Sequence, residues 1–377
     1  MKIKSFRFDN HKENWHLKET FFNDLNLLVG ISGVGKTRIL KALNLVCDVA
    51  RDNDYRLDGI DWKISFTHLG QEYEWELKSA LMDEDVLQES KSSEILYERL
   101  VLIENHKPTE LLVRPENGDY PRLRGNKLHK LKKTESAITL LSEEDYIAPV
   151  YKAFRRFLFS ETHQHVDVGM SNDPEEITMD QGNTLQAFFE NTSINTPAVI
   201  KGYLLQKFFT DDFDEVKEYY FEMFPKVNDI KIDVKANKSG GYKFSLAIKE
   251  SVSDNWILQP KISSGMFRTL VHLIEVSTAP ASSIIVIDEF ENSLGINCMP
   301  ELTDFILDKV IELQFILTSH HPYIIHNMPW KKWQIVNRHD SNVKVTKATD
   351  IPELDTASSL DKFTQLINLA EYGEGIS

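Results

Sequence analysis

The chain has 377 residues, of which 41% are hydrophobic and 27% are charged, a composition typical of a globular protein large enough for two lobes. A net charge of −15 disfavours general affinity for nucleic acid, which comes from neutralising phosphates. There is no apolar run near the roughly 18 residues needed to cross a bilayer and no signal-peptide core, and Cys47 and Cys298 lack metal-type spacing. We therefore expect a cytoplasmic protein without membrane contact or a disulfide scaffold.

The N-terminal segment predicts a strand, a glycine loop and a helix in succession. Residues 2–8 alternate in polarity, which indicates a strand, and residues 25–30 form an apolar run that ends in glycine. Apolar residues then recur at helical spacing between Ile39 and Cys47. The loop between them has the pattern G-x-x-x-x-G-K-[ST], beginning at Gly30.

This loop is a candidate phosphate cradle. Its glycines let successive backbone N–H groups point at phosphate oxygens, Lys36 would reach the β and γ phosphates, and the Thr37 hydroxyl would ligate Mg²⁺. The dipole of the following helix favours the same anionic ligand. The predicted nucleotide-binding residues are Gly30, Ser32, Gly33, Val34, Gly35, Lys36, Thr37 and Arg38.

The middle of the chain changes character twice. Residues 61–120 contain short strand-like runs separated by turn residues, and residues 136–225 show helical periodicity, for example over 146–159 and 200–224. Residues 229–250 predict a hairpin around Ser239-Gly240-Gly241.

The last third alternates helices with apolar strands, which implies a parallel sheet covered by helices. Helical spacing over 265–276 and 300–311 alternates with apolar strands at 284–287, 314–319 and 332–338.

Polar side chains follow two of these strands. Asp288 and Glu289 end one strand, where they suit an Mg²⁺-associated carboxylate and a general base, and His320 follows the next. Ligands of open parallel sheets bind beyond the carboxyl ends of the strands, so these residues and the glycine loop can share one site. Ser263 and Gly265 begin a helix and offer a second anion-binding helix start, or simply an N-cap.

In this order of motifs the chain resembles the ABC-type ATPase heads of the SMC, RecF and OLD group, including AAA ATPases of bacterial anti-phage systems. The resemblance covers about 1–50 and 255–330, with "ISSGMFR" similar to the signature motif and "LTSHHPYII" to the switch-histidine segment. Gln181 resembles the glutamine of that group's glutamine loop. The chain departs from the group at Ser32, where asparagine is usual, and in the loop "FENSLG", and it lacks a long coiled coil and a Toprim nuclease.

The resemblance implies an α/β fold: an ABC-type P-loop ATPase head with a mixed sheet flanked by helices, plus an α-helical/β insertion lobe. The expected parts are a split ATPase core over 1–60 and 255–345, a β-rich lobe over 61–135, a mainly helical insertion over 136–254 that ends in the hairpin, and a C-terminal tail over 346–377.

The resemblance also implies a homodimer, or a higher homo-oligomer, whose heads sandwich ATP and Mg²⁺. Lys36 and Thr37 of one chain and Ser263 and Gly265 of the other would bind each ATP. Glu289 would polarise the attacking water, while Asp288 would hold the Mg²⁺ shell and His320 would sense the γ-phosphate. The expected activity is slow ATP hydrolysis. The residues that contact adenine are open, with His11 and Trp15 as candidates.

Three functions remain open at this point. The first is an ATPase that controls a separate effector, a nuclease or toxin of a defence system. The second is a RecF-like DNA-repair clamp, for which the basic segment Arg122 to Lys133 is the candidate DNA contact. The third is a metal-dependent nuclease using His163, His165 and Asp167.

Overall fold

The computed structural model describes residues 1–51, 53, 55–82, 93–116, 119–160, 168–170, 174, 177, 184–236, 241–252, 254–295, 298–355 and 359–368. The chain divides into two compact units. The first unit comprises Met1–Phe157, Ser282–Asp288 and Gln314–Ser377, and the second comprises Leu158–Ala281 and Glu289–Leu313.

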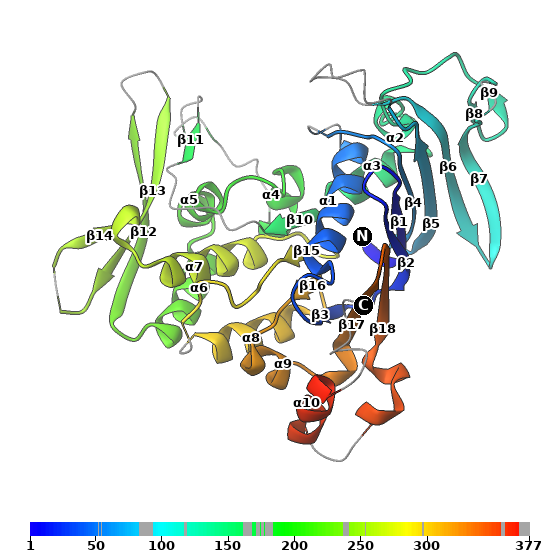
Figure 1. Ribbon diagram of the computed structural model, residues 1–377. Coiled ribbons are helices and arrows are strands. Elements are labelled where there is room, and N and C mark those ends of the chain that lie inside the picture. The colour runs from blue at the N-terminus through cyan, green and yellow to red at the C-terminus, as the bar shows by residue number, and fades with distance from the viewer. Residues whose placement is uncertain are drawn as a thin grey trace. The chain divides into compact units, whose positions relative to one another are not determined.

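The first unit is built on a large mixed sheet (Figure 1). Its strands, in sheet order, are β15 (Ile284–Ile287), β16 (Gln314–Thr318), β3 (Leu25–Val29), β17 (Trp333–His339), β18 (Asn342–Lys347), β2 (Trp15–Phe21), β1 (Lys2–Asn10), β4 (Ile60–His68), β5 (Gln71–Ser79), β6 (Ile95–Glu104), β7 (Lys107–Arg114), β8 (Arg122–Leu123) and β9 (Asn126–Lys127). Its helices are α1 (Lys36–Arg51), α2 (Ala137–Leu140), α3 (Ala148–Phe154), α9 (Pro322–Asn327) and α10 (Ser359–Asn368).

Both parallel and antiparallel pairing occur in this sheet. Strands β15, β16, β3 and β17 run parallel to one another. β18 pairs antiparallel with β17 and parallel with β2. From β2 through β1 and β4 to β9, each strand pairs antiparallel with the next one in the sheet. β3, β15 and β16 are buried along their whole length, and β5 alternates buried residues with half-buried or exposed ones. The expected fold class, a mixed sheet with helices in an α/β protein, is confirmed.

Helix packing against the antiparallel strands rests on aromatic side chains. Phe154 of α3 meets Trp75 of β5 and Phe66 of β4, with ring centroids 5.2 and 5.1 Å apart, and Trp62 packs edge-on against Trp75. Buried aromatic rings remove large apolar areas from water, so this cluster fixes α3 on the sheet.

The second unit combines helices with a smaller antiparallel sheet. Its strands are β11 (Val168–Met170), β12 (Val227–Ala236), β13 (Tyr242–Glu250) and β14 (Trp256–Leu258), and its helices are α4 (Leu185–Asn191), α5 (Ala198–Phe208), α6 (Thr210–Met223), α7 (Ser264–Ser277) and α8 (Met299–Lys309). β12 and β13 form the long hairpin expected over 229–250 (Figure 1), and its turn lies outside the described residues. β10 (Phe157–Ser160) begins at the last residue of the first unit's segment.

Two expected helices end earlier than their periodicity suggested. The helical pattern over 146–159 stops at Phe154, and the β-favouring run Phe157-Leu158-Phe159 forms β10 instead. The pattern over 200–224 is broken at Phe209, whose φ of −135° and ψ of 63° separate α5 from α6. In the first case the apolar residues suit both a helix and a strand, and tertiary packing selects between them. In the second case both segments remain helical, and only the direction of the chain changes at Phe209.

Candidate functional site

Strand register places the predicted acidic residue and the glycine loop at one edge of the sheet. In β15 and β16, Ile287 lies opposite Leu317, and in β16 and β3, Thr318 lies opposite Leu28. Asp288 and Gly30 therefore both follow the carboxyl ends of their strands, with β16 between them. The Thr318 hydroxyl donates to Oδ1 of Asp288 at 2.6 Å, which orients that half-buried carboxylate at the edge.

The glycine loop fits its place only because it has glycines. A Cβ on Gly30 would lie 2.6 Å from the carbonyl oxygen of Val336, closer than carbon and oxygen can approach. Gly35 has a φ of +105°, which disfavours other residues, and a Cβ there would lie 3.4 Å from Nε1 of Trp15. Gly30 thus has no room for a side chain against β17, whereas Gly35 is favoured by its backbone conformation beside Trp15 of β2.

The Trp15 side chain packs against the glycine loop at Gly35. Its side chain is only 1% exposed, and the Arg38 guanidinium lies 4.8 Å from its ring centroid and forms an ion pair with Glu13. Val34 is also buried, whereas Ser32 and Gly33 are exposed. Two predicted binding residues, Val34 and Arg38, therefore contribute to the architecture of the loop, and Ser32 and Gly33 form its surface.

Lys36 and Thr37 begin α1 and are half-buried. The Lys36 ammonium donates to the carbonyl oxygens of Gly30 and Ile31 at 2.7 and 3.1 Å, so it lies within the curve of the loop. The first turn of α1 contains no acidic residue. The positive end of the helix dipole and the lysine charge thus act together on one small region, which is the electrostatic environment that a phosphate requires.

The two histidines after β16 have different environments. Nδ1 of His321 accepts the backbone N–H of Tyr323 at 3.2 Å and caps α9, so this ring serves the helix. His320 is exposed at the same sheet edge as Asp288. Its placement is compatible with the predicted role, which stays a prediction.

In the second unit, Ser263 and Gly265 form the start of α7. The Ser263 hydroxyl accepts the N–H of Met266 at 3.3 Å as the N-cap, and Ser263 and Ser264 are exposed. A Cβ on Gly265 would lie 2.4 Å from the carbonyl oxygen of Ser293. The glycine therefore allows the loop after the Asp-Glu strand to pack directly on the helix start.

Glu289 occupies a conformation that few residues adopt. Its φ is +46°, and its exposed carboxylate accepts from the side-chain amide of Asn292 at 3.3 Å. Non-glycine residues with positive φ cost free energy and concentrate at functional sites. The buried Arg268 of α7 donates from Nη2 to the carbonyl oxygen of Glu289 at 3.1 Å and holds this backbone in place.

A buried polar network continues from Arg268. Nε of Arg268 donates to Nε2 of His272 at 3.2 Å, and the Ser160 hydroxyl donates to Glu275 at 2.6 Å and lies 3.5 Å from Nδ1 of His272. Because arginine can only donate, Nε2 of His272 carries the lone pair and the ring is neutral. Burial, and then the Arg268 charge, lower the pKa of His272 to about 3.

Sequence reasoning did not find Thr318 or Arg268. Thr318 is the last residue of a buried strand, and Arg268 lies inside an apolar helix pattern; each contacts a partner distant in the sequence. Gln181 and the cluster of His163, His165 and Asp167 lie outside the described residues. Within the described ranges no group of three or more His, Cys, Asp or Glu suits a metal ion, and no helix could cross a membrane.

A family model and several solved structures are similar to this chain. Residues 193–326 match the family described as "AAA domain, putative AbiEii toxin, Type IV TA system", which confirms the resemblance to AAA ATPases over that range. No sequence among the curated proteins matches the chain.

The solved structures are heads of SMC proteins. An SMC head bound to the C-winged helix domain of ScpA is 12% identical, with coverage of 92% of this chain and 97% of that chain and a TM-score of 0.47. The SMC head domain from Thermotoga maritima is 11% identical, with coverage of 92% and 99% and a TM-score of 0.39. A Pyrococcus furiosus Smc head bound to the C-terminal domain of ScpA is 12% identical, with coverage of 97% and 98% and a TM-score of 0.45.

Gly265→Ala should destabilise the protein although alanine favours helices. The new Cβ would meet the Ser293 carbonyl, so the loop or the helix start must shift, at a cost of about 1–3 kcal/mol. Urea unfolding measures the change. Gly169→Ala is the matched control, because its Cβ would lie an ordinary 3.7 Å from the nearest atom, Tyr242 O, and equal stability of the two variants would contradict the close approach.

His272 should make the protein less stable in mild acid. Its folded pKa of about 3 lies below the unfolded value of 6.5, so the unfolded chain binds the proton first and stability falls as pH drops below 6.5. At pH 5.5 the loss is about 1.4 kcal/mol relative to neutral pH. His272→Gln keeps an acceptor for Arg268 and removes this loss. Urea midpoints at pH 7.5 and 5.5 compare the two proteins, and parallel pH dependence would refute the assignment.

Proposed function

We propose that this protein is an ABC-type ATPase that binds ATP, hydrolyses it slowly and dimerises around it, and that it regulates or scaffolds a separate nuclease or toxin in bacterial anti-phage defence. The observation that carries the proposal is the shared sheet edge. There the glycine loop, the start of α1 and the Thr318-bound Asp288 meet within one unit.

The residues at this edge fit a nucleoside triphosphate with Mg²⁺. The cradle leaves no space for a Cβ at Gly30, and Lys36 and the α1 dipole supply positive charge where the triphosphate would lie. Thr37 and Asp288 supply the hydroxyl and carboxylate oxygens that Mg²⁺ prefers. When bound, the metal neutralises phosphate charge.

Glu289 is the proposed general base. It follows Asp288 directly in the chain, its carboxylate is exposed, and its strained backbone is held by Arg268. A base must keep a fixed direction to orient a water molecule, and the Arg268 bond to the Glu289 carbonyl provides that rigidity. His320 would contact the γ-phosphate from the end of β16.

The start of α7 is the proposed surface for a second chain. Ser263 and Ser264 are exposed, and the first turn of α7 has no acidic residue, so this helix start favours an anion. A γ-phosphate held by Lys36 of one chain and Ser263 of another would add contacts to both, which makes association depend on ATP. The toxin–antitoxin description of the matched family supports a role in a defence system.

The decisive experiment compares ATP turnover and assembly mass for wild type and Glu289→Gln. Loss of a general base lowers turnover by about 100-fold or more, while ATP binding persists and the variant accumulates as an ATP-dependent dimer. Lys36→Ala should abolish ATP binding. Glu312→Gln changes an exposed carboxylate outside the proposed site and serves as the control. Normal turnover by Glu289→Gln, or ATP binding by Lys36→Ala, would overturn the motif assignment.

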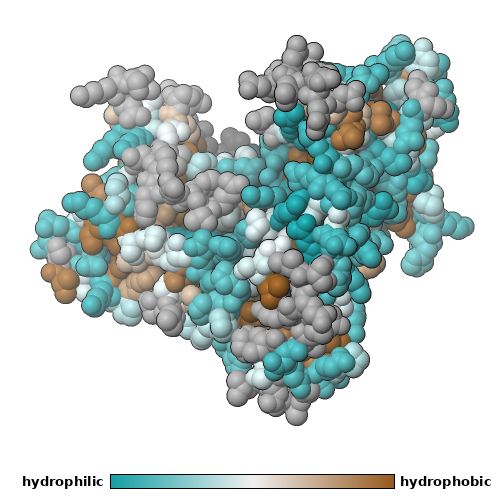
Figure 2. Space-filling model, viewed as in Figure 1, coloured by the Kyte–Doolittle hydropathy of each residue, from teal (hydrophilic) through white to brown (hydrophobic). Residues whose placement is uncertain are grey.

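A RecF-like DNA clamp is the second candidate, and one observation favours it. The surface over β8 and β9 is mainly hydrophilic in Figure 2, and the basic side chains of this segment are exposed: Arg122, Arg124, Lys127, Lys130, Lys132 and Lys133. Lys127 lies 3.6 Å from the ring centroid of Tyr120, which is itself 43% exposed. Cations and an exposed aromatic ring together suit a nucleic-acid backbone.

The DNA alternative predicts a salt-sensitive affinity that depends on this segment. Replacing Arg122 and Lys127 by Glu should weaken binding to duplex DNA at every sequence and reduce the salt slope by about one for each lost phosphate contact. Fluorescence anisotropy over a salt series measures both. Lys226→Glu, an exposed charge reversal in the second unit, should leave binding unchanged, and equal losses in all variants would exclude a local DNA contact.

A further inference from the structure

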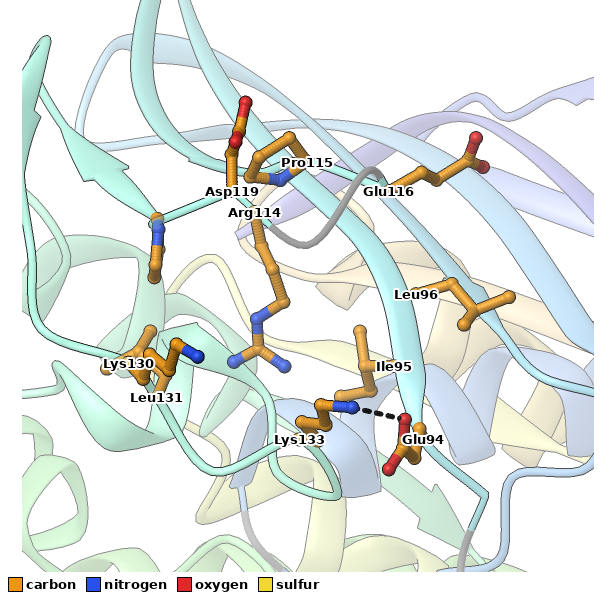
Figure 3. Close-up of a pocket in the computed structure, with 11 residues that line it drawn as sticks. Glu94, Ile95, Leu96, Arg114, Pro115, Glu116, Asp119, Lys130, Leu131 and Lys133 are labelled. Carbon is orange, nitrogen blue, oxygen red and sulfur yellow. Dashed lines mark hydrogen bonds and ion pairs between the residues drawn. The ribbon is translucent and has the colours of Figure 1, made fainter.

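The first unit contains a pocket that is distinct from the nucleotide loop. It lies between the start of β6, the end of β7 and the segment after β9 (Figure 3). Its volume is about 150 Å³, and it is lined by Glu94, Ile95, Leu96, Arg114, Pro115, Glu116, Asp119, Pro121, Lys130, Leu131 and Lys133. An apolar cavity of about this size holds a benzene-sized molecule, so the occupant is small.

Arg114 is the central feature of this pocket. The residue is 7% exposed, and its guanidinium points between Ile95, Leu131 and Lys133 in Figure 3. Nη2 donates to the carbonyl oxygen of Glu135 at 3.1 Å. Nε and Nη1 are buried and have no hydrogen-bond partner among the residues that the structure describes. Buried donors are almost always paired, so these two require an acceptor from outside this set.

The nearest carboxylate does not supply that acceptor. Oε2 of Glu98 lies 3.8 Å from Nη2 of Arg114, which balances the buried charge. The oxygens of Glu98 accept from Nε1 of Trp75, the Ser136 hydroxyl and the Ala137 N–H at 3.2, 2.6 and 2.8 Å. Glu98 therefore bonds to α2 and β5, and it leaves Nε and Nη1 of Arg114 without a partner among the described residues.

The other acidic residues of the pocket are also engaged or directed elsewhere. Glu94 pairs with Lys133 at 2.7 Å, and Glu116 pairs with Lys78 at 2.9 Å. Figure 3 shows the carboxylates of Glu116 and Asp119 pointing away from the guanidinium. Lys130 is exposed at the rim. These ion pairs and the directions of these carboxylates thus leave Nε and Nη1 of Arg114 for an acceptor from outside the described residues.

Apolar side chains form much of the remaining wall. Ile95 and Pro121 are buried, Leu131 and Pro115 are half-buried, and Leu96 adds a further apolar surface. The Ile95 N–H donates to the carbonyl oxygen of Lys133 at 2.7 Å, which fixes the segment after β9 against β6. A fully polar anion such as phosphate would leave this wall without a contact partner, whereas an apolar body would cover it.

We propose that this pocket binds a small organic carboxylate: the carboxylate accepts from Nε or Nη1 of Arg114, and its apolar body packs against Ile95 and Leu131. Lys130 adds attraction at the rim. The ligand is either a free small acid or a Glu-type side chain presented by a partner, because both offer the same carboxylate on an apolar stem.

Saturation-transfer difference NMR with benzoate on the intact protein tests the proposal. Benzoate should receive saturation from wild type, and butyrate should displace it at concentrations where sodium chloride of equal ionic strength does not. Acetyl-glutamate amide is the second competitor. If it displaces benzoate, a glutamate side chain of a partner is a sufficient ligand. If only butyrate displaces benzoate, the ligand is a free small acid. Inorganic phosphate that competes as well as butyrate would overturn the proposal.

Variants locate the signal. Arg114→Met keeps the length of the side chain and should abolish the benzoate signal, while Arg122→Met, which removes an exposed arginine outside the lining, should keep it. Lys130→Glu reverses the charge of an exposed rim residue, so the variant should fold normally. It should weaken benzoate binding about threefold or more, and this test stands even if Arg114→Met folds poorly. Unchanged benzoate binding in Lys130→Glu and in folded Arg114→Met would refute the site.

Discussion

The parallel register of β15, β16 and β3 is the constraint on which the candidate nucleotide site depends. Parallel neighbours bring the carboxyl ends of their strands to one edge, and here Asp288 bonds to Thr318, which lies opposite Leu28 just before the glycine loop. A shift of one residue would turn the buried faces of these strands around. The apolar residues that fill β15 and β16 therefore also fix where the polar residues emerge.

Close backbone approach plays the same role at two separate helix starts. Gly30 allows the loop before α1 to lie against the Val336 carbonyl, and Gly265 allows the start of α7 to lie against the Ser293 carbonyl. At Gly30 the absent side chain lets the loop lie on β17, and at Gly265 it lets a loop lie on the start of α7. Both helix starts are free of acidic residues in their first turns, so the electrostatic character of the two places is alike.

Two buried arginines show how hydrogen bonding separates a structural role from a binding role. Arg268 donates to His272 and to the Glu289 carbonyl. Burial, and then the Arg268 charge, lower the pKa of His272, so this ring stays neutral and can accept the bond. Arg114 lines a pocket and has one donor bonded to Glu135, while its buried Nε and Nη1 have no partner among the described residues. The first holds a backbone in a strained conformation, and the second is the basis for the proposed carboxylate site.

The sequence by itself determined the local features. The spacing of Ile39, Leu40 and Leu43 predicted the buried face of α1, the pattern from Gly30 to Thr37 predicted the loop, and the alternation over residues 2–8 predicted β1. These depend on neighbours within a few residues, which periodicity records. Only the tertiary structure decided the pairing of β18 with β2, the end of α3 at Phe154, the Thr318–Asp288 bond and the burial of Arg114 and Arg268. Each of these contacts depends on packing between segments far apart in the chain, which local patterns do not encode.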